Sequence, residues 1–303
     1  GGAGFIGSHL VDRLVSRGDR VVVVDNLSSG RRENLNPSAE LHHIDIRSPD
    51  LRNVVKTESP EVVFHLAAQM SVAVSAREPL LDAEINILGM LNLLEAVRAV
   101  PSDARAKVVF ASTGGAIYGE PESLPVPETH PCRPVSPYGA SKLAGEVYLG
   151  TYRAVYGLDY SVVRLANVYG PRQDPHGEAG VVAIFGRAML AGEPVRIFGD
   201  GADERDYIFV GDVVRAFELA SERGGPTAYN IGTGEGIAVA TLARQMASLI
   251  GYDRAPVQAP PRPGDLRKIR LDASKARQEL GWQPRVQLAS GLAETIEFLR
   301  TRQ

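Results

Sequence analysis

The sequence has one cysteine, little net charge and no long apolar run, and each shortage excludes a class of protein. Cys132 is the single cysteine among 303 residues, which excludes an intramolecular disulfide framework and favours a cytoplasmic location. No apolar run approaches the roughly 20 residues that cross a bilayer, so we expect no membrane partner. The formal net charge is −3 with both signs spread along the chain, which gives no reason to expect nucleic acid as a partner.

What the chain does contain is an alternation of β-branched runs with amphipathic segments. The runs that predict strands are Arg20–Asp25, Val62–Ala68, Lys107–Thr113 and Ala228–Gly234. The segments that predict helices are His9–Ser16, Leu80–Val100 and Tyr138–Val155. This order predicts an α/β fold with a doubly wound, parallel sheet of the Rossmann type. We expect residues 1–165 to form a nucleotide-binding domain, and residues 166–303 a smaller lobe with segments that return to the sheet.

A glycine-rich heptad, GGAGFIG, places glycines at Gly1, Gly4 and Gly7. Small residues allow a tight turn and a close approach of the backbone to a pyrophosphate, and the following helix aims its N–H groups at the phosphates. Asp25 ends the next strand about 20 residues on, where a carboxylate binds the adenosine ribose. A carboxylate there repels a 2′-phosphate, so the pattern predicts NAD rather than NADP. Because such a loop follows a buried strand, we also expect a strand before Gly1 in the complete protein.

Two further positions near this end have competing interpretations. Asp45 follows another strand-like run, and it is expected either to approach the adenine or to cap a turn. His42 and His43 stand side by side, but adjacent residues of a strand point to opposite faces. We therefore predict no metal site there or elsewhere.

A tyrosine and a lysine four residues apart, Tyr138 and Lys142, are expected to share one face of a helix. A tyrosine phenol ordinarily titrates near pH 10. A neighbouring ammonium and a cationic nicotinamide both favour the phenolate and lower its pKa. The pair therefore predicts a general base that works near neutral pH.

With these residues identified, the sequence resembles the extended short-chain dehydrogenase/reductases of the NAD-dependent sugar epimerase/dehydratase family, most closely their UDP-glucose 4-epimerases. The resemblance covers essentially the whole chain. It is carried, in order, by GGAGFIG, VVVVDNLSSG, DIRS, VFHLAAQ, STGGAIYG, SPYGASK, RLANVYGPR, IFGDG, RDYIFVGDV, NIGTG and RPGDL with DASKA and LGW. It implies epimerisation of a UDP-sugar at C4 with tightly bound NAD, and a homodimer.

The resemblance also implies roles for individual residues. Those expected along the dinucleotide are Gly1, Gly4, Phe5, Ile6, Gly7, Asp25, Asn26, Asp45, Ile46, Leu66, Ala67, Ala68, Gln69, Ser112, Tyr138 and Lys142. Those expected at the UDP-sugar are Asn167, Val181, Arg196, Phe198, Arg205, Arg262 and Asp265. Arginine suits a diphosphate because its guanidinium forms charge-assisted, often bidentate bonds with phosphate oxygens.

The family's third catalytic residue is usually a Ser or Thr four positions before the Tyr of a Tyr-Gly pair. Counting back from Tyr118 reaches Gly114, which has no hydroxyl. We expect Thr113 to serve as the hydroxyl relay instead. Direct action of Tyr138 on the sugar oxygen and a bridging water are the alternatives.

The same stretch distinguishes between reactions. The family's 4,6-dehydratases place an Asp–Glu pair after the hydroxyl, but here those positions are Gly115 and Ala116, which transfer no protons. Together with Gly114 they are expected to leave a low floor on which a 4-keto sugar turns over. The alternatives are a UDP-glucuronate 4-epimerase or decarboxylase that uses Arg172, a UDP-N-acetylglucosamine 4-epimerase whose pocket is opened by Ile269, and a regulatory NAD-binding protein.

Overall fold

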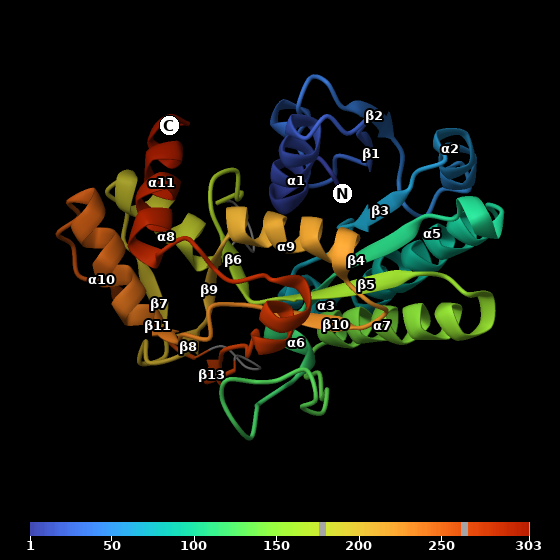
Figure 1. Cartoon of the computed structure of the whole chain (residues 1–303). Helices are drawn as coiled ribbons and strands as arrows, with labels where there is room; N and C mark the ends of the chain where they lie inside the picture. The colour runs from blue at the N-terminus through green and yellow to red at the C-terminus, as the bar shows by residue number, and fades with distance from the viewer. Residues whose placement is uncertain (176–179, 262–265, 303) are drawn as a thin grey trace.

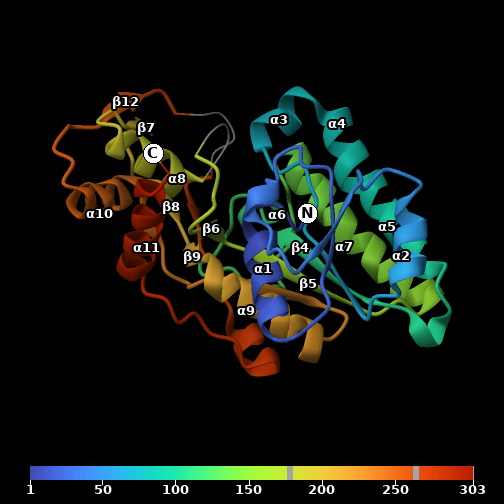
Figure 2. The ribbon, with the colours of Figure 1, turned by 90° about the horizontal axis from the view of Figure 1, so that it is seen from above.

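The structure, a computed structural model, describes residues 1–175, 180–261 and 266–302. The chain forms two lobes that lie side by side when seen from above (Figures 1 and 2). The first half of the chain builds one lobe, and most of the second half builds the other. Among the described residues, no helix is both long and apolar enough to cross a membrane.

Parallel strands form the centre of the first lobe. Their bounds are β1 (Val22–Asp25), β2 (Glu40–His43), β3 (Val62–His65), β4 (Lys107–Thr113), β5 (Tyr160–Leu165) and β10 (Ala228–Ile231). Four of them pair in the order β10-β5-β4-β3, and all three pairings are parallel. Strands β1 and β2 form a separate parallel pair. Valine-rich runs favour this arrangement because β-branched side chains pack well on a pleated surface.

Helices cover both faces of the four-stranded sheet, as a parallel sheet requires. In the first lobe they are α1 (Phe5–Ser16), α2 (Leu51–Glu58), α3 (Val72–Arg77), α4 (Pro79–Ala83), α5 (Gly89–Arg98), α6 (Gly114–Ile117) and α7 (Pro137–Tyr156), with a π-helical turn, η2 (Glu84–Leu88), between α4 and α5. Short 3-10 turns lie at η1 (Arg32–Asn34) and η3 (Ser102–Ala104). Helix α7 packs on β4 and β5 with α5 beside it, and α9 (Val210–Arg223) packs on the opposite face with α1 (Figure 1).

Local sequence explains where α7 begins and ends. The Ser136 hydroxyl accepts a hydrogen bond from the Gly139 N–H at 3.1 Å, and Pro137 follows at the first helical position. Gly157 ends the helix with a φ of 71°, a left-handed conformation that glycine adopts without steric cost. The helix that carries Tyr138 and Lys142 is therefore fixed at both ends by its own sequence.

The second lobe is built from shorter elements. Its strands are β6 (Asn167–Tyr169), β7 (Arg196–Phe198), β8 (Glu204–Arg205), β9 (Tyr207–Phe209), β11 (Ile237–Ala238), β12 (Val257–Ala259) and β13 (Lys268–Ile269), and its helices are α8 (Val181–Leu190), α10 (Val239–Ile250), η4 (Ala276–Leu280) and α11 (Leu288–Arg300). They form small sheets, β11-β8-β13, β12-β7 and β6-β9. Strand β10 and helix α9 belong to the second half of the chain. Nevertheless, β10 pairs with β5 in the central sheet, and α9 packs on the face of that sheet.

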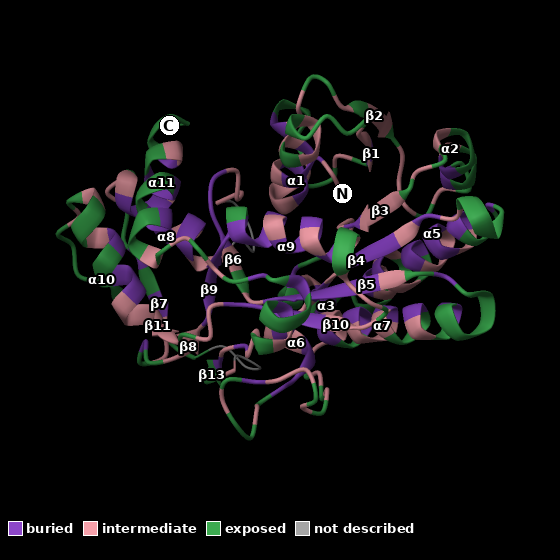
Figure 3. Ribbon diagram, in the orientation of Figure 1, coloured by how far each residue is buried: buried purple, intermediate pink, exposed green. Residues whose placement is uncertain are grey.

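The core follows the central strands into both lobes. Strand β4 places Val108, Val109 and Phe110 in the interior, each at most 1% exposed, and the buried colouring of β4 and β5 in Figure 3 continues into α7 and α9. Each such side chain stabilises the fold by about 1.5–3 kcal/mol through removal of apolar surface from water. This packing holds the carboxyl end of β4, where Ser112 and Thr113 lie, in a fixed position.

The α/β fold with a parallel sheet is confirmed. The predicted strand Lys107–Thr113 matches β4, and the predicted helices Leu80–Val100 and Tyr138–Val155 correspond to α4-η2-α5 and to α7. The predicted strands Arg20–Asp25 and Val62–Ala68 are shorter in the structure. The residues outside these bounds, Arg20–Val21 and Leu66–Ala68, lie in loops.

Candidate active site

The glycine-rich loop is packed too tightly for larger residues. A Cβ on Gly7 would lie 2.8 Å from the Gly2 Cα and closer still to the Gly1 carbonyl oxygen. Gly1 in turn lies against the backbone of Leu66 and Ala67 at the end of β3. Helix α1 begins directly after Gly4 and has no acidic residue in its first turn. No carboxylate of this turn therefore competes with an anion for the N-terminal N–H groups of the helix.

Asp25 at the end of β1 fixes the loop from the other side. Its carboxylate accepts hydrogen bonds from the Ala3 N–H at 2.9 Å and the Leu27 N–H at 2.8 Å, and the residue is only 7% exposed. The next residue, Asn26, donates from Nδ2 to the Asp45 carboxylate at 2.8 Å. The structure thus brings together three residues predicted along the adenosine half of a dinucleotide.

Asp45 is held mainly by Arg47, two residues further along the chain. Arg47 donates to it from the backbone N–H and from the guanidinium at about 2.9–3.0 Å. These bonds, against the opposing effect of partial burial, hold the pKa of the Asp45 carboxyl well below its usual range. Ile46 follows and packs against Gly89 of α5. Asp45 therefore both caps its own turn and borders Asn26.

The segment after β3 is tied to the helices through Gln69. Its backbone N–H donates to Asn86 Oδ1 at 2.9 Å, and its Nε2 donates to Asp82 Oδ1 at 2.8 Å. Asn86 Nδ2 also donates to Asp82 at 3.0 Å and to the Ser141 hydroxyl at 3.2 Å. Leu66, Ala67 and Ala68 lie just before Gln69 and are partly buried. This network joins the predicted dinucleotide-lining segment to α7.

Tyr138 and Thr113 meet at the end of β4. Burial, followed by the negative charge of Asp82, raises the pKa of Tyr138 to about 12, while a hydrogen bond with the Thr113 hydroxyl acts in the opposite direction. Thr113 is thus adjacent to the phenol, as expected for a hydroxyl relay. The protein by itself does not lower the pKa of Tyr138, contrary to what its spacing from Lys142 suggests, because burial disfavours the phenolate.

Lys142 lies one turn further along α7 and is only 4% exposed. Its Nζ donates to the Ala111 carbonyl oxygen at 3.0 Å and stands 6.0 Å from the centre of the Tyr138 ring. Burial lowers the pKa of Lys142 to about 8, although the charges of Asp82 and Glu146 oppose the shift. A lysine with this pKa loses a substantial part of its charge just above neutral pH.

Ser112 is bonded to α7 one turn beyond Lys142. The Ser112 hydroxyl donates to Glu146 Oε1 at 2.5 Å in the interior. Its predicted place along the dinucleotide therefore depends on the backbone and not on the hydroxyl.

The two glycines after Thr113 differ in their surroundings. A Cβ on Gly114 would lie 2.8 Å from Leu271 Cδ2 and closer still to Cδ1, so a larger residue would have to displace the Leu271 side chain. A Cβ on Gly115 would meet only Thr113 Oγ1 at 3.8 Å and Asn167 Oδ1 at 3.9 Å. Gly114 therefore does not contribute to the expected open floor, because Leu271 fills the space beside it. Gly115 alone faces Thr113 across free space.

The predicted sugar-nucleotide residues come from several short elements of the second lobe. Asn167 at the start of β6 and Val181 at the start of α8 line the same small cavity, of about 20 Å³. Arg196 and Phe198 lie on β7, and Arg205 lies on β8. Arg262 and Asp265 lie outside the described residues. Ile269 is 3% exposed and packs in a hydrophobic cluster with Leu271.

Sequence reasoning missed two buried residues beside the catalytic cluster, Glu146 and Arg164. Glu146 follows Lys142 by four residues, and that spacing, which places both on one helix face, would have revealed it. Arg164 comes from β5 and forms an ion pair with Glu146 at 2.6 Å, with both side chains 9% exposed. No local pattern marks this arginine, because its partner lies on another element.

A comparison of the sequence with known protein families shows the class to which the chain belongs. The model of the family described as GDP-mannose 4,6 dehydratase matches residues 1–295. The chain belongs to this family, and the resemblance to extended short-chain dehydrogenase/reductases is confirmed.

Individual proteins within reach of this comparison are similar to nearly the whole chain. The UDP-glucose 4-epimerase of Mycolicibacterium smegmatis is 51% identical over 308 residues, which cover 100% of this chain and 97% of that protein. A solved UDP-glucose 4-epimerase with UDP-glucose from Thermotoga maritima has a TM-score of 0.97 and 52% identity, covering 100% of this chain and 97% of the other. A Thermus thermophilus UDP-glucose 4-epimerase in complex with NAD has a TM-score of 0.93 and 47% identity, covering 99% and 97%.

Proposed function

We propose that this protein is an NAD-dependent UDP-glucose 4-epimerase that interconverts UDP-glucose and UDP-galactose. The observation that carries the proposal is the contact between Thr113 and Tyr138 at the end of β4, with Lys142 beside the phenol and Gly115 leaving free space next to the hydroxyl. The same activity is named for relatives that match nearly the full length at about half identity.

The residues present fit NAD. The tight glycine loop, the start of α1 without acidic residues, and the buried Asp25 carboxylate supply a phosphate site and a ribose site. When bound, NAD accepts and returns the hydride at C4 of the sugar, and its oxidised ring adds a positive charge that favours the Tyr138 phenolate. Asn26, Asp45 and Ile46 border the adenosine side, and Gln69 borders the path towards Tyr138.

Tyr138 takes the proton of the sugar 4-hydroxyl and later returns it, with the Thr113 hydroxyl as the group in contact with the phenol. The Lys142 ammonium stabilises the phenolate and is anchored on the Ala111 carbonyl oxygen. For the hydrogen to return to C4 on the opposite side, the 4-keto sugar would have to present its other face. The space beside Gly115 supports this turnover because no side chain blocks it.

Two alternative reactions are less well supported by the described residues. Dehydration needs an acid and a base after the hydroxyl, and Gly115 and Ala116 offer neither. Chemistry on a glucuronate needs a cation for the carboxylate, but the Arg172 guanidinium is engaged with Asp12 of α1 at 2.7 Å. These contacts favour a 4-epimerase that acts on neutral hexoses.

A homodimer is supported by apolar side chains exposed on two adjoining helical segments. Leu80 and Leu88 on α4-η2 are 79% and 58% exposed, and Val147 and Val155 on α7 are each 62% exposed. The segments pack against one another, so these exposed side chains lie on neighbouring elements. A second copy of the chain would cover them in an isologous interface. We retain the cytoplasm as the expected location.

The experiment that tests the proposal is a substrate comparison. Purified protein is incubated separately with UDP-galactose, UDP-glucuronate and UDP-N-acetylglucosamine, and the nucleotide sugars are separated by chromatography. We expect rapid conversion of UDP-galactose to UDP-glucose without added cofactor, because retained NAD is not consumed. Conversion of UDP-glucuronate in preference to UDP-galactose would contradict the proposal. Sedimentation of the same sample measures whether the protein is a dimer.

A further inference from the structure

Three successive residues of β4 bond to three residues spaced one turn apart on α7. The Ala111 carbonyl oxygen accepts from Lys142 at 3.0 Å, the Ser112 hydroxyl donates to Glu146 at 2.5 Å, and the Thr113 hydroxyl is hydrogen-bonded to Tyr138. All three partners, Tyr138, Lys142 and Glu146, lie on α7 at four-residue spacing. The catalytic end of the strand is therefore held along one helix, with the Glu146 contact two turns from the Tyr138 contact.

Glu146 is held in turn by Arg164. The guanidinium donates from Nη2 to Glu146 Oε2 at 2.6 Å and from Nε to both carboxylate oxygens at 3.1–3.2 Å. Arg164 Nη1 also donates to the Tyr118 hydroxyl at 2.8 Å, and Tyr118 donates to Asn230 Oδ1 at 2.7 Å. This chain of bonds fixes the Glu146 carboxylate with respect to β5 and β10, which do not belong to the candidate active site.

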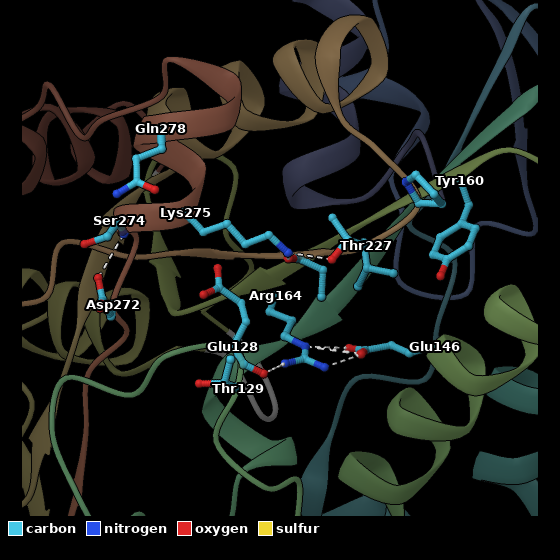
Figure 4. Close-up of a pocket in the computed structure, with 13 residues that line it drawn as sticks. Glu128, Thr129, Glu146, Tyr160, Arg164, Thr227, Asp272, Ser274, Lys275 and Gln278 are labelled. Carbon is cyan, nitrogen blue, oxygen red and sulfur yellow. Dashed lines mark hydrogen bonds and ion pairs between the residues drawn. The ribbon is translucent and has the colours of Figure 1, made fainter.

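The Glu146–Arg164 pair forms part of the wall of a cavity of about 640 Å³ (Figure 4). Glu128, Asp272 and Lys275 also line this cavity. In Figure 4, the Glu146 carboxylate and the Arg164 guanidinium point at each other, and Asp272 lies apart from them beside Ser274. Asp272 therefore offers a second carboxylate in the same cavity, engaged with the Ser274 N–H rather than with the pair.

The charged and titratable groups around Lys142 come from four elements. Glu146 and Tyr138 lie on α7 itself, Asp82 lies on α4, and His65 lies on β3. Burial, followed by the Lys142 charge, holds the pKa of His65 well below its usual range, so the imidazole is neutral. Arg164 of β5 is the further charge that faces Glu146. Among the residues that the structure describes, the charges of Asp82 and Glu146 offset the cost of burying the ammonium.

We propose that Glu146 is a positioning residue for this reaction: it holds the end of β4 through Ser112, and its negative charge stabilises the Lys142 ammonium. The inference rests on the proposed function, since it concerns the groups that move the proton. Glu146 has no contact with the reacting atoms and acts through Ser112, Thr113 and Lys142. A single carboxylate thus sets both the place of the hydroxyl relay and the charge beside the phenol.

The first test uses Glu146→Gln, which retains an oxygen for Ser112 and removes the charge. We expect kcat to fall about 10- to 100-fold with little change in KM, and the alkaline limb of the pH–rate profile to move to lower pH by about one unit. The direction follows because the Glu146 charge raises the pKa of Lys142, which the variant loses. Asp272→Asn removes the same charge from the same cavity and is expected to retain the wild-type profile.

In Glu146→Gln the buried Arg164 guanidinium loses its counter-charge, which destabilises the fold. If the single variant does not fold, Glu146→Gln is combined with Arg164→Met, which removes the unpaired cation, and the pH profile is measured on the double variant. Ser112→Ala leaves the ion pair intact and is expected to lower kcat about fivefold at an unchanged pH profile. A wild-type kcat in Ser112→Ala overturns the positioning of β4, and an unmoved alkaline limb without Glu146 overturns its action on Lys142.

A readout without catalysis separates this inference from the proposed function. The chain has five lysines, so side-chain NMR titration can follow Lys142, assigned by comparison with Lys142→Arg. We expect the pKa of Lys142 to be lower in Glu146→Gln than in the wild-type protein. Failure of the wild-type protein to convert UDP-galactose would overturn the proposed function, whereas an unchanged Lys142 titration would overturn the role of Glu146.

Discussion

The two lobes position their candidate functional groups by different means. In the first lobe, consecutive residues of β4 are held by one long helix, and the glycine loop is fixed by backbone contacts that leave no room for a Cβ. In the second lobe, Asn167, Val181 and Arg205 come from separate short elements. We expect the first arrangement to hold the groups that move the proton in one rigid unit, and the second to let separate side chains adjust to the UDP-sugar.

This difference predicts where substitutions act. Changes in the first lobe should alter the chemical step, because proton transfer needs groups within hydrogen-bond reach. Changes in the second lobe should alter the affinity for the UDP-sugar, because charge-assisted bonds to a diphosphate are made in ground state and transition state alike.

The largest effect is expected for Tyr138→Phe. Removal of the phenol should lower kcat by about two to four orders of magnitude with KM nearly unchanged, because the general base is lost. Steady-state rates with UDP-galactose measure the effect. Tyr148→Phe on the exposed side of the same helix is the matched control and should retain wild-type rates. Near-normal turnover by Tyr138→Phe would remove the phenol from the mechanism.

An intermediate effect is expected at the two neighbouring glycines, and it should differ in kind. Gly114→Ala places a methyl group against Leu271 and should destabilise the protein by about 1–3 kcal/mol. Gly115→Ala meets open space, so it should fold with a normal melting temperature and yet show a lower kcat. Thermal unfolding and turnover of both variants separate the two cases.

Restoration of stability by Leu271→Ala in the Gly114→Ala background is the control for the packing explanation. If Gly115→Ala were as active as the wild-type protein, the space beside Thr113 would have no part in turnover of the 4-keto sugar.

The smallest effect is expected in the second lobe, for Arg205→Lys. Loss of the planar guanidinium should raise KM for UDP-galactose about tenfold and leave kcat unchanged, because lysine binds phosphate only as a point charge. Arg244→Lys, on the exposed side of α10, is the matched control. A fall in kcat at constant KM would show that the division of labour between the lobes is wrong.

Local sequence predicted the parts of this molecule that depend on near neighbours. The β-branched runs marked the strands, and the four-residue spacing of Tyr138 and Lys142 marked the helix face. Thr113 was expected beside Tyr138 and lies there. These features follow from the periodicity of helices and strands, which can be recognised within a short segment of sequence.

Contacts between distant segments could not be predicted in this way. Leu271 beside Gly114 accounts for a glycine that the sequence alone assigns to the substrate. The direction of the Tyr138 pKa shift was also missed, since it depends on burial and on Asp82 of α4. Arg164 and Glu146 pair across two elements, and only the fold brings them together.

The measurement that tests the account most directly follows the hydrogen at C4 of the sugar. UDP-galactose labelled with deuterium at C4 is converted by the purified protein in ordinary water, and the UDP-glucose product is examined by NMR and mass spectrometry. The account predicts that the label stays at C4 of the product, because the hydride removed by Tyr138-assisted oxidation returns to the same carbon from the other face. Loss of the label to solvent, or exchange at C5, would contradict it.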